Sequence, residues 1–84
     1  MPRPTELQMG DVTLRAADGP FRILRHGGRS TDSWREIWSG PSVQSARTQF
    51  VNSSGVMRQG GVQLLAADGR TLAEQWAPRL RTRW

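Results

Sequence analysis

Alternating hydrophobic and polar positions run through two segments of the chain that share the pattern V-x-L-x-A-A-D-G. The first copy occupies residues 12–19 and the second occupies residues 62–69. Apolar residues at every second position are typical of a strand with one buried face, and Asp-Gly is a strong signal for a tight turn. Each copy therefore predicts a strand that ends in a turn.

The residues that follow the two copies predict different turns. Arg70 follows the second copy, and its backbone N–H can close a tight turn. Pro20 follows the first copy and has no N–H to donate, so the usual hydrogen bond to Ala17 cannot form there. We expect a tight hairpin after the second copy, a looser turn after the first, and both strands in one sheet.

Similar patterns predict the remaining elements. The predicted strands cover residues 11–17, 21–26, 33–39, 62–67 and 70–77. Leu7 and Met9 alternate with polar neighbours, and they extend the first strand backward if Gly10 forms a bulge. Between the third and fourth strands, apolar residues recur at spacings of three and four. This spacing predicts one helix over residues 41–59, with a kink or break near Gly55.

The order of these elements, β-β-β-α-β-β, predicts an α+β fold. We expect a small antiparallel sheet of four to five strands with one helix packed on one face, and the other face solvated or covered by a partner. The length of 84 residues predicts a single domain, placed at residues 10–78. Residues 1–9 are expected to form a flexible tail because they contain two prolines, and residues 79–84 a basic tail.

Composition adds a bias toward anionic partners. All twelve basic residues are arginine, against seven acidic residues, and the net charge is +5. Arginine in place of lysine is typical of GC-rich genomes and suggests a small bacterial or phage accessory protein. The excess of positive charge over acids favours polyanions such as nucleic acid.

Other classes of protein receive no support from the composition. There is no cysteine, which excludes disulfides and thiolate metal sites. No apolar run approaches the roughly 20 residues of a membrane span. Residues 1–6 lack the apolar segment of a secretory signal, so we expect a cytoplasmic protein.

Two tryptophans in the third strand are the first candidate binding residues. Trp34 and Trp38, with Glu36 between them, are predicted to share one face of the sheet. Exposed there, they could stack unpaired bases. Alternatively, both belong to the core under the helix, because a domain this small has few other large side chains. In that case they would pack with a set of apolar residues comprising Phe50, Met57, Leu64 and Trp76.

Arginines supply the other candidates. Those in the body are Arg22, Arg25, Arg29 and Arg35, and those in the tail are Arg79, Arg81 and Arg83, followed by Trp84. The tail either grips a phosphate backbone or is an ordinary solvated terminus. The loop at residues 26–31 contains a glycine pair, which either exposes backbone N–H groups to an anion or forms an ordinary hairpin loop. The start of the helix at residues 41–42 is a similarly unspecific anion site.

Catalysis has no convincing basis in the sequence. His26, Asp32 and Ser30 or Ser33 lie in one loop, but a catalytic triad is defined by its geometry and not by such proximity. No cluster of histidine and acidic residues has the spacing of metal ligands. We therefore expect no enzyme activity, no cofactor and no metal.

Two functions remain. The first is a binding module without catalysis, which self-associates as a homodimer or docks on another protein, because tryptophan and arginine anchor protein interfaces. The alternative is a nucleic-acid-binding accessory protein that uses an arginine-rich face with tryptophan stacking. The binding module is the preferred hypothesis, because it requires fewer independent features of the sequence to coincide. Neither a membrane nor a small-molecule substrate is indicated.

Overall fold

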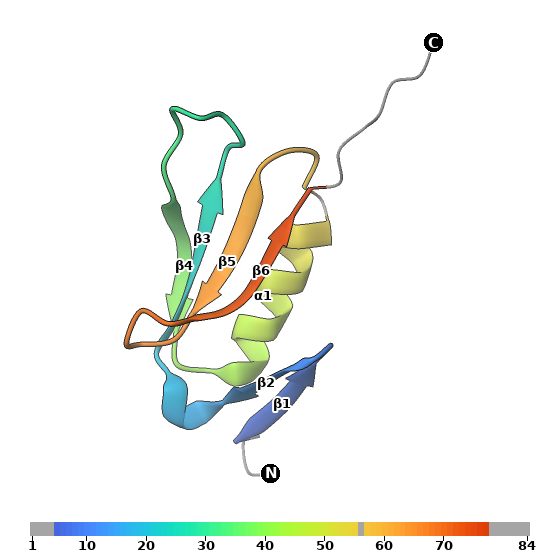
Figure 1. Ribbon diagram of the computed structural model, residues 1–84. Helices are drawn as coiled ribbons and strands as arrows, with labels where there is room; N and C mark the ends of the chain where they lie inside the picture. Colours follow the sequence, from blue (N-terminus) through green and yellow to red (C-terminus); the bar gives the residue numbers. More distant parts are fainter. Residues whose placement is uncertain (1–4, 56, 78–84) are drawn as a thin grey trace.

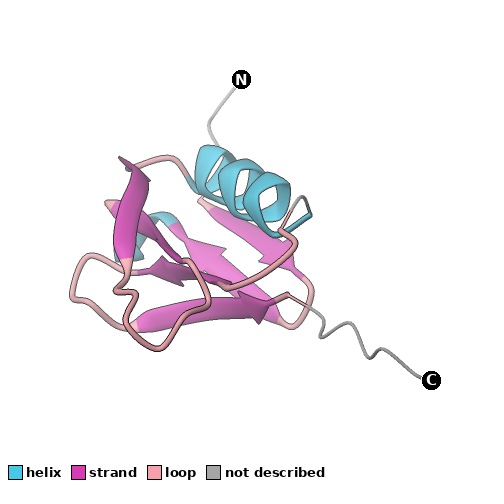
Figure 2. Ribbon diagram, turned by 90° about the horizontal axis from the view of Figure 1, so that it is seen from above, coloured by secondary structure: helices cyan, strands magenta, loops and turns pink. Residues whose placement is uncertain are grey.

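The computed structural model describes residues 5–55 and 57–77 of the chain. Within them it has six strands, one α-helix and one turn of 3-10 helix at Ala16–Asp18. The elements are β1 (Glu6–Met9), β2 (Val12–Arg15), β3 (Phe21–His26), β4 (Arg35–Gly40), α1 (Val43–Gly55), β5 (Gly61–Leu65) and β6 (Thr71–Trp76). Both sheets are antiparallel, and the larger has the order β4-β3-β5-β6. Helix α1 lies on one side of it (Figures 1 and 2), which confirms the predicted α+β fold.

Residues 6–9 form a strand of their own rather than a backward extension of β2. Gly10, with a φ of 60°, reverses the chain, and β1 pairs with β2 in a separate two-stranded sheet. Glycine reaches this φ at little cost because it has no Cβ. The folded part of the chain therefore begins earlier than residue 10. Residues 1–4 and 79–84, where tails were predicted, lie outside the described residues.

The second copy of the shared pattern forms the predicted tight hairpin. Gly69, at a φ of 91°, donates its N–H to the carbonyl of Ala66 over 3.0 Å. The N–H of Arg70 instead reaches the side chain of Asp68, also over 3.0 Å. A three-residue loop with glycine in its last position is a common way to join two strands.

The first copy forms the looser turn, as Pro20 predicted. Its Ala-Ala-Asp residues make the 3-10 turn, and the Gly19–Pro20 peptide bond is cis. The expectation that both copies lie in one sheet was wrong. Strand β2 pairs only with β1 among the described strands, whereas β5 is central in the larger sheet. The sequence pattern specifies a strand and a turn, but not the neighbouring strand.

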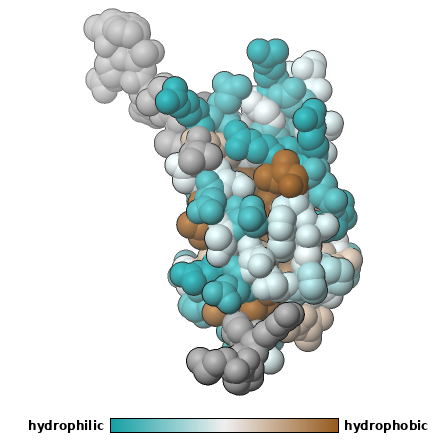
Figure 3. Space-filling model, turned by 180° about the vertical axis from the view of Figure 1, so that it is seen from behind, coloured by the Kyte–Doolittle hydropathy of each residue, from teal (hydrophilic) through white to brown (hydrophobic). Residues whose placement is uncertain are grey.

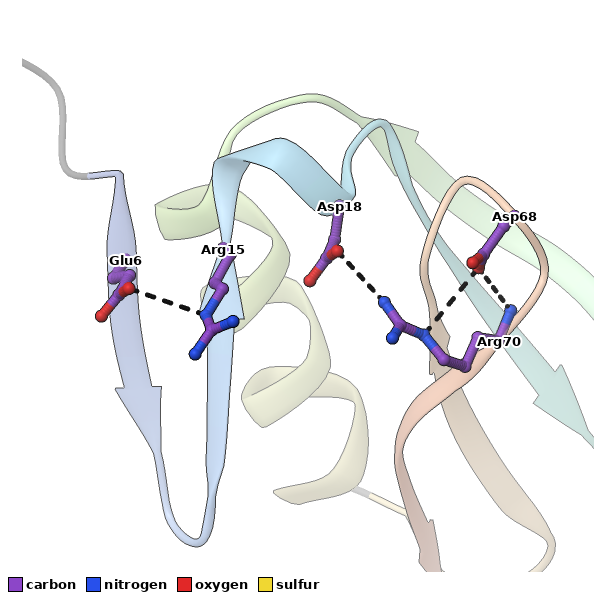
Figure 4. Close-up of polar contacts among 5 residues, drawn as sticks. All are labelled: Glu6, Arg15, Asp18, Asp68 and Arg70. Carbon is purple, nitrogen blue, oxygen red and sulfur yellow. Dashed lines mark hydrogen bonds and ion pairs between the residues drawn. The ribbon is translucent and has the colours of Figure 1, made fainter.

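The two copies nevertheless meet in space through their turns. Arg70 places Nη2 3.1 Å from Oδ1 of Asp18 (Figure 4), and Ala67 donates its N–H to the Asp18 carbonyl over 2.8 Å. These contacts join segments about fifty residues apart in the sequence. We call this end of the larger sheet the turn end.

The core lies between the larger sheet, the helix and the small sheet. Its largest fully buried side chains come from β2, β3 and β5: Leu14, Phe21, Ile23, Val62 and Leu64. The helix adds the predicted apolar stripe of Val43, Ala46 and Phe50. It begins after Ser42, whose Oγ accepts the N–H of Ser45, two residues later than predicted. It ends four residues earlier than predicted, at Gly55, where a kink or break was expected.

A β-bulge in β4 corrects the predicted positions of the tryptophans. Ile23 pairs with Trp38 but Leu24 pairs with Glu36, which leaves Ile37 without a partner on β3. An extra residue reverses the alternation of side chains along a strand. Trp38 therefore packs against the core with Ile23, whereas Glu36 lies on the open face of the sheet, opposite the helix. The prediction that Trp34, Glu36 and Trp38 share a face was wrong.

A second bulge in β6 has the same effect at the other edge of the sheet. Leu64 pairs with Ala73 but Leu65 pairs with Thr71, so Leu72 is the extra residue. Leu72 packs against the core, while Trp76 lies on the open face and is 46% exposed. Trp76 is therefore not a core residue, contrary to the core interpretation of the sequence.

Candidate anion-binding site at the loop end

The end of the larger sheet opposite the turn end carries the candidate site. We call it the loop end. It comprises the β3–β4 loop and the α1–β5 connection, which lie against each other at the top of Figure 1. Gln59 fixes this contact by donating Nε2 to the carbonyl of Gly27 over 3.1 Å. Two loops that are separate in the sequence are thus joined into one surface.

Two arginines face each other on neighbouring strands, where the sheet meets the loop end. Arg25 on β3 pairs directly with Arg35 on β4, and Arg25 pairs on its other side with the core residue Val62. Residues paired across antiparallel strands point to the same face, so both arginines lie on the helix side of the sheet. Like charges in this position repel each other. Among the described residues, neither guanidinium forms an ion pair with a carboxylate.

The arginine pair borders a hollow of about 520 Å³. The hollow is lined by Arg25, Gly27, Thr31, Asp32, Ser33, Arg35 and Ile37. Asp32 adds one negative charge to this lining, and its Oδ2 accepts the N–H of Arg29 over 3.0 Å. Two guanidinium groups and two hydroxyls therefore remain as donors toward an anion.

The wall of the hollow is held by hydrogen bonds around His26. The N–H of Gly28 donates to Nδ1 over 2.9 Å, which assigns the ring proton to Nε2 in the neutral ring. Nε2 lies 3.1 Å from the carbonyl oxygen of Asp32 and donates to it. A site with walls already fixed loses less conformational entropy on binding.

Charge is distributed unevenly between the two ends of the sheet. The described residues contain eight arginines and all seven acidic residues, so four arginines, at positions 3 and 79–83, lie outside them. Near the turn end, arginines are paired with acids, as Figure 4 shows for Arg15 with Glu6 and Arg70 with Asp18. The loop end and the strand residues next to it hold a cationic set of Arg25, Arg29, Arg35 and Arg58. The acids described there are Asp32 in the loop and Glu74, whose carboxylate accepts the Trp76 indole N–H.

The structure separates those predicted binding residues that it describes into four groups. Arg25 and Arg35 share the hollow, and Arg29 is exposed in the loop beside it. Arg22 lies on the open face in a 2.6 Å ion pair with Glu36. Trp38 belongs to the core, and Trp34 to an aromatic cluster. The tail residues Arg79, Arg81, Arg83 and Trp84 lie outside the described residues.

The aromatic cluster consists of His26, Trp34 and Trp76 on the open face at the loop end. Their ring centroids are 5.2 to 5.6 Å apart, and the rings are tilted or edge-on to one another. Trp76 was missed as a site residue because its position on the open face depends on the pairing of β5 with β6. Thr31 lies in the loop that the sequence suggested as an anion site, but its hydroxyl was not singled out. Ser33 was considered only as a triad member, because no signal in the sequence distinguishes these hydroxyls from others in the loop.

Glu74 fixes the orientation of the Trp76 ring. Its carboxylate accepts Nε2 of Gln63 over 2.6 Å and Nε1 of Trp76 over 2.8 Å. Hydrogen bonds to the charged form stabilise it, so the bond from Gln63, followed by that from Trp76, lowers the pKa of Glu74 below its ordinary value of 4.5.

Acidification should release the Trp76 indole. Because the pKa of Glu74 is lowered in the folded state, the stabilisation is fully present above pH 4.5 and disappears as the pH falls through the lowered value. We expect the Nε1–H resonance of Trp76 to shift in a single acidic step when followed by NMR. Glu74→Gln should abolish this step. A step that persists in Glu74→Gln would show that another group titrates.

Comparisons of the chain with protein-family models, curated proteins and solved structures found no match. No three histidine or acidic side chains gather as metal ligands within residues 5–55 and 57–77. In the same part of the chain, no helix is both long and apolar enough to cross a membrane.

Proposed function

We propose that this protein is a non-catalytic binding module whose loop end binds the phosphate backbone of nucleic acid. The observation that carries the proposal is the direct pairing of Arg25 with Arg35 beside a hollow lined by hydroxyls. A phosphate between the two guanidinium groups would offset their repulsion and accept bidentate hydrogen bonds from them. Thr31 and Ser33 would supply further donors.

The described part of the chain ends next to the same end of the sheet. Ala77 donates its N–H to the carbonyl of Gly60 over 2.9 Å, so β6 delivers the chain to the loop end. The sequence continues from there with three arginines at positions 79, 81 and 83 and no acidic residue. Each arginine that neutralises a phosphate releases a counterion, which strengthens binding at low salt.

Self-association has less support from the described surface. The exposed large hydrophobic side chains are Ile37, Val51 and Trp76, which belong to three different elements. The face shown in Figure 3 is mostly hydrophilic, and its hydrophobic residues form small, separate spots. A stable protein interface usually needs a larger continuous apolar centre. Self-association stays a prediction from the sequence.

A salt series of binding measurements tests the proposal. We expect a labelled oligonucleotide to bind at low salt in fluorescence anisotropy, with an affinity that falls steeply as salt rises. Arg35→Gln should weaken binding about fivefold, roughly 1 kcal/mol for one exposed charged contact, and reduce the salt slope by about one.

Arg47→Gln provides the matched control. Arg47 is exposed on α1 and has no ion-pair partner among the described residues, so the substitution removes the same charge away from the hollow. We expect Arg47→Gln to change the affinity less than Arg35→Gln. No binding of any oligonucleotide at low salt would refute the proposed function, and equal effects of the two substitutions would refute the assigned site. The mass in solution, measured on the same samples, reports self-association separately.

A further inference from the structure

We infer that the nucleic acid bound at the loop end is single-stranded, and that Trp76 is the platform on which one unpaired base stacks. The inference rests on the proposed function and names its ligand more closely. It depends on the contacts that hold the half-exposed indole ring of Trp76, and on where this ring lies relative to the hollow beside Arg25 and Arg35.

One face of the Trp76 ring is covered by the backbone of β5. Gly61 pairs with Trp76, and a Cβ added to Gly61 would lie 2.8 Å from Cδ2 and Cε3 of the indole. The ring therefore lies across the glycine, in space that any other residue would fill. Trp76 is still 46% exposed, so much of its surface away from Gly61 is accessible to a ligand.

Three contacts hold the ring in this position. Its Nε1–H bonds Glu74 over 2.8 Å, and the ring packs edge-to-face with His26 and Trp34 at centroid distances of 5.6 and 5.5 Å. A ring that is already oriented loses little rotamer freedom when a ligand stacks on it. Any of the bases can stack on such an aromatic side chain, because every base has a π face.

The hollow and the platform lie on opposite faces of the same end of the sheet. Arg25 points to the helix side and the next residue, His26, points to the open face with Trp76. Four neighbouring strands place β4 about 14 Å from β6, since strands are roughly 4.8 Å apart. A ligand that reaches both sites must therefore bend sharply around the loop end.

A single strand meets this requirement and a duplex does not. Duplex DNA is stiff over roughly 150 base pairs, and its bases are paired and stacked within the helix. A single strand bends easily and presents unstacked bases to aromatic side chains. The carboxylate of Glu74 beside the ring repels phosphate, which orients the base toward Trp76 and the backbone toward the arginines.

Substitution of Trp76 tests the inference with an oligo(dT) strand and an oligo(dT)·oligo(dA) duplex of equal length. Trp76→Ala should weaken binding of the single strand by roughly 5- to 150-fold, the effect of losing one base stack. Trp76→Phe, which keeps an aromatic ring, should recover part of that loss. The affinity for the duplex should change little in either variant. Circular dichroism of each variant verifies that it is folded.

The outcomes separate the inference from the proposed function. Equal binding of strand and duplex, with no effect of Trp76→Phe or Trp76→Ala in folded protein, would overturn the single-strand inference and leave the phosphate site intact. Preference for the duplex would also overturn it. Failure of both probes to bind the wild-type protein at low salt would refute the proposed function itself.

Discussion

Replacing Phe21 by alanine is expected to lower the free energy of unfolding by about 3–5 kcal/mol. Phe21 is fully buried at the start of β3, and the edge of its ring packs against the first turn, where a Cβ on Gly19 would lie 3.2 Å from Cε2. The substitution removes the ring and leaves a cavity between the sheet and the turn. Because a domain of this kind is stable by only roughly 5–15 kcal/mol, much of its stability would be lost.

Urea unfolding followed by far-ultraviolet circular dichroism measures this effect. Val51→Ala serves as the control, since Val51 is 48% exposed on the helix and its loss should change stability by no more than about 0.5 kcal/mol. Similar midpoints for the wild-type protein and Phe21→Ala would contradict the core described above. The urea midpoint of the conservative variant Phe21→Leu should lie between those of the wild-type protein and Phe21→Ala.

Gly60→Ala is expected to be the most damaging of the glycine substitutions. Gly60 has a φ of 84°, and an added Cβ would overlap the carbonyl oxygen of His26. Backbone in the left-handed region costs roughly 1–2 kcal/mol for alanine, and crowding against fixed backbone adds about 1–3 kcal/mol. The strand pairing of β3 with β5 at the loop end should loosen, since His26 pairs with the next residue, Gly61.

Gly69→Ala separates the two causes in the same urea experiment. Gly69 has a similar φ of 91°, but nothing lies within 4 Å of an added Cβ. Its substitution should cost only the backbone strain of about 1–2 kcal/mol. An equal loss of unfolding free energy in Gly60→Ala and Gly69→Ala would show that crowding at Gly60 contributes nothing. The same Gly60→Ala protein should also bind oligonucleotides more weakly, because its loop end is displaced.

The fold class could be predicted from local patterns because each depends on neighbouring residues. Strand alternation, the Asp-Gly turn and the spacing of Val43, Ala46 and Phe50 identify the elements and the apolar side of the helix. Pro20 predicted the looser first turn for the same reason, since its missing N–H is a property of one residue. The strand at residues 6–9 was misjudged because alternation does not reveal whether Gly10 bulges or reverses the chain.

The candidate site could be predicted only in part. Arg25, Arg29 and Arg35 were identified by charge, but their grouping in one place depends on the register between β3 and β4. Trp34 and Trp38 were identified by size and then assigned to one face by simple alternation. The bulge at Ile37 separates them, and nothing in the composition of the strand marks that residue as the extra one.

The sequence by itself determined where five of the six strands form, where the helix places its apolar stripe, and that arginine carries all the basic charge. The tertiary structure alone decided which side chains meet. It brought Arg70 to Asp18, Arg25 to Arg35, and Trp76 to His26 and Trp34. The physical reason is that strand register is set by pairing between distant segments. A shift of one residue reverses every side chain beyond it, whereas the local pattern stays the same.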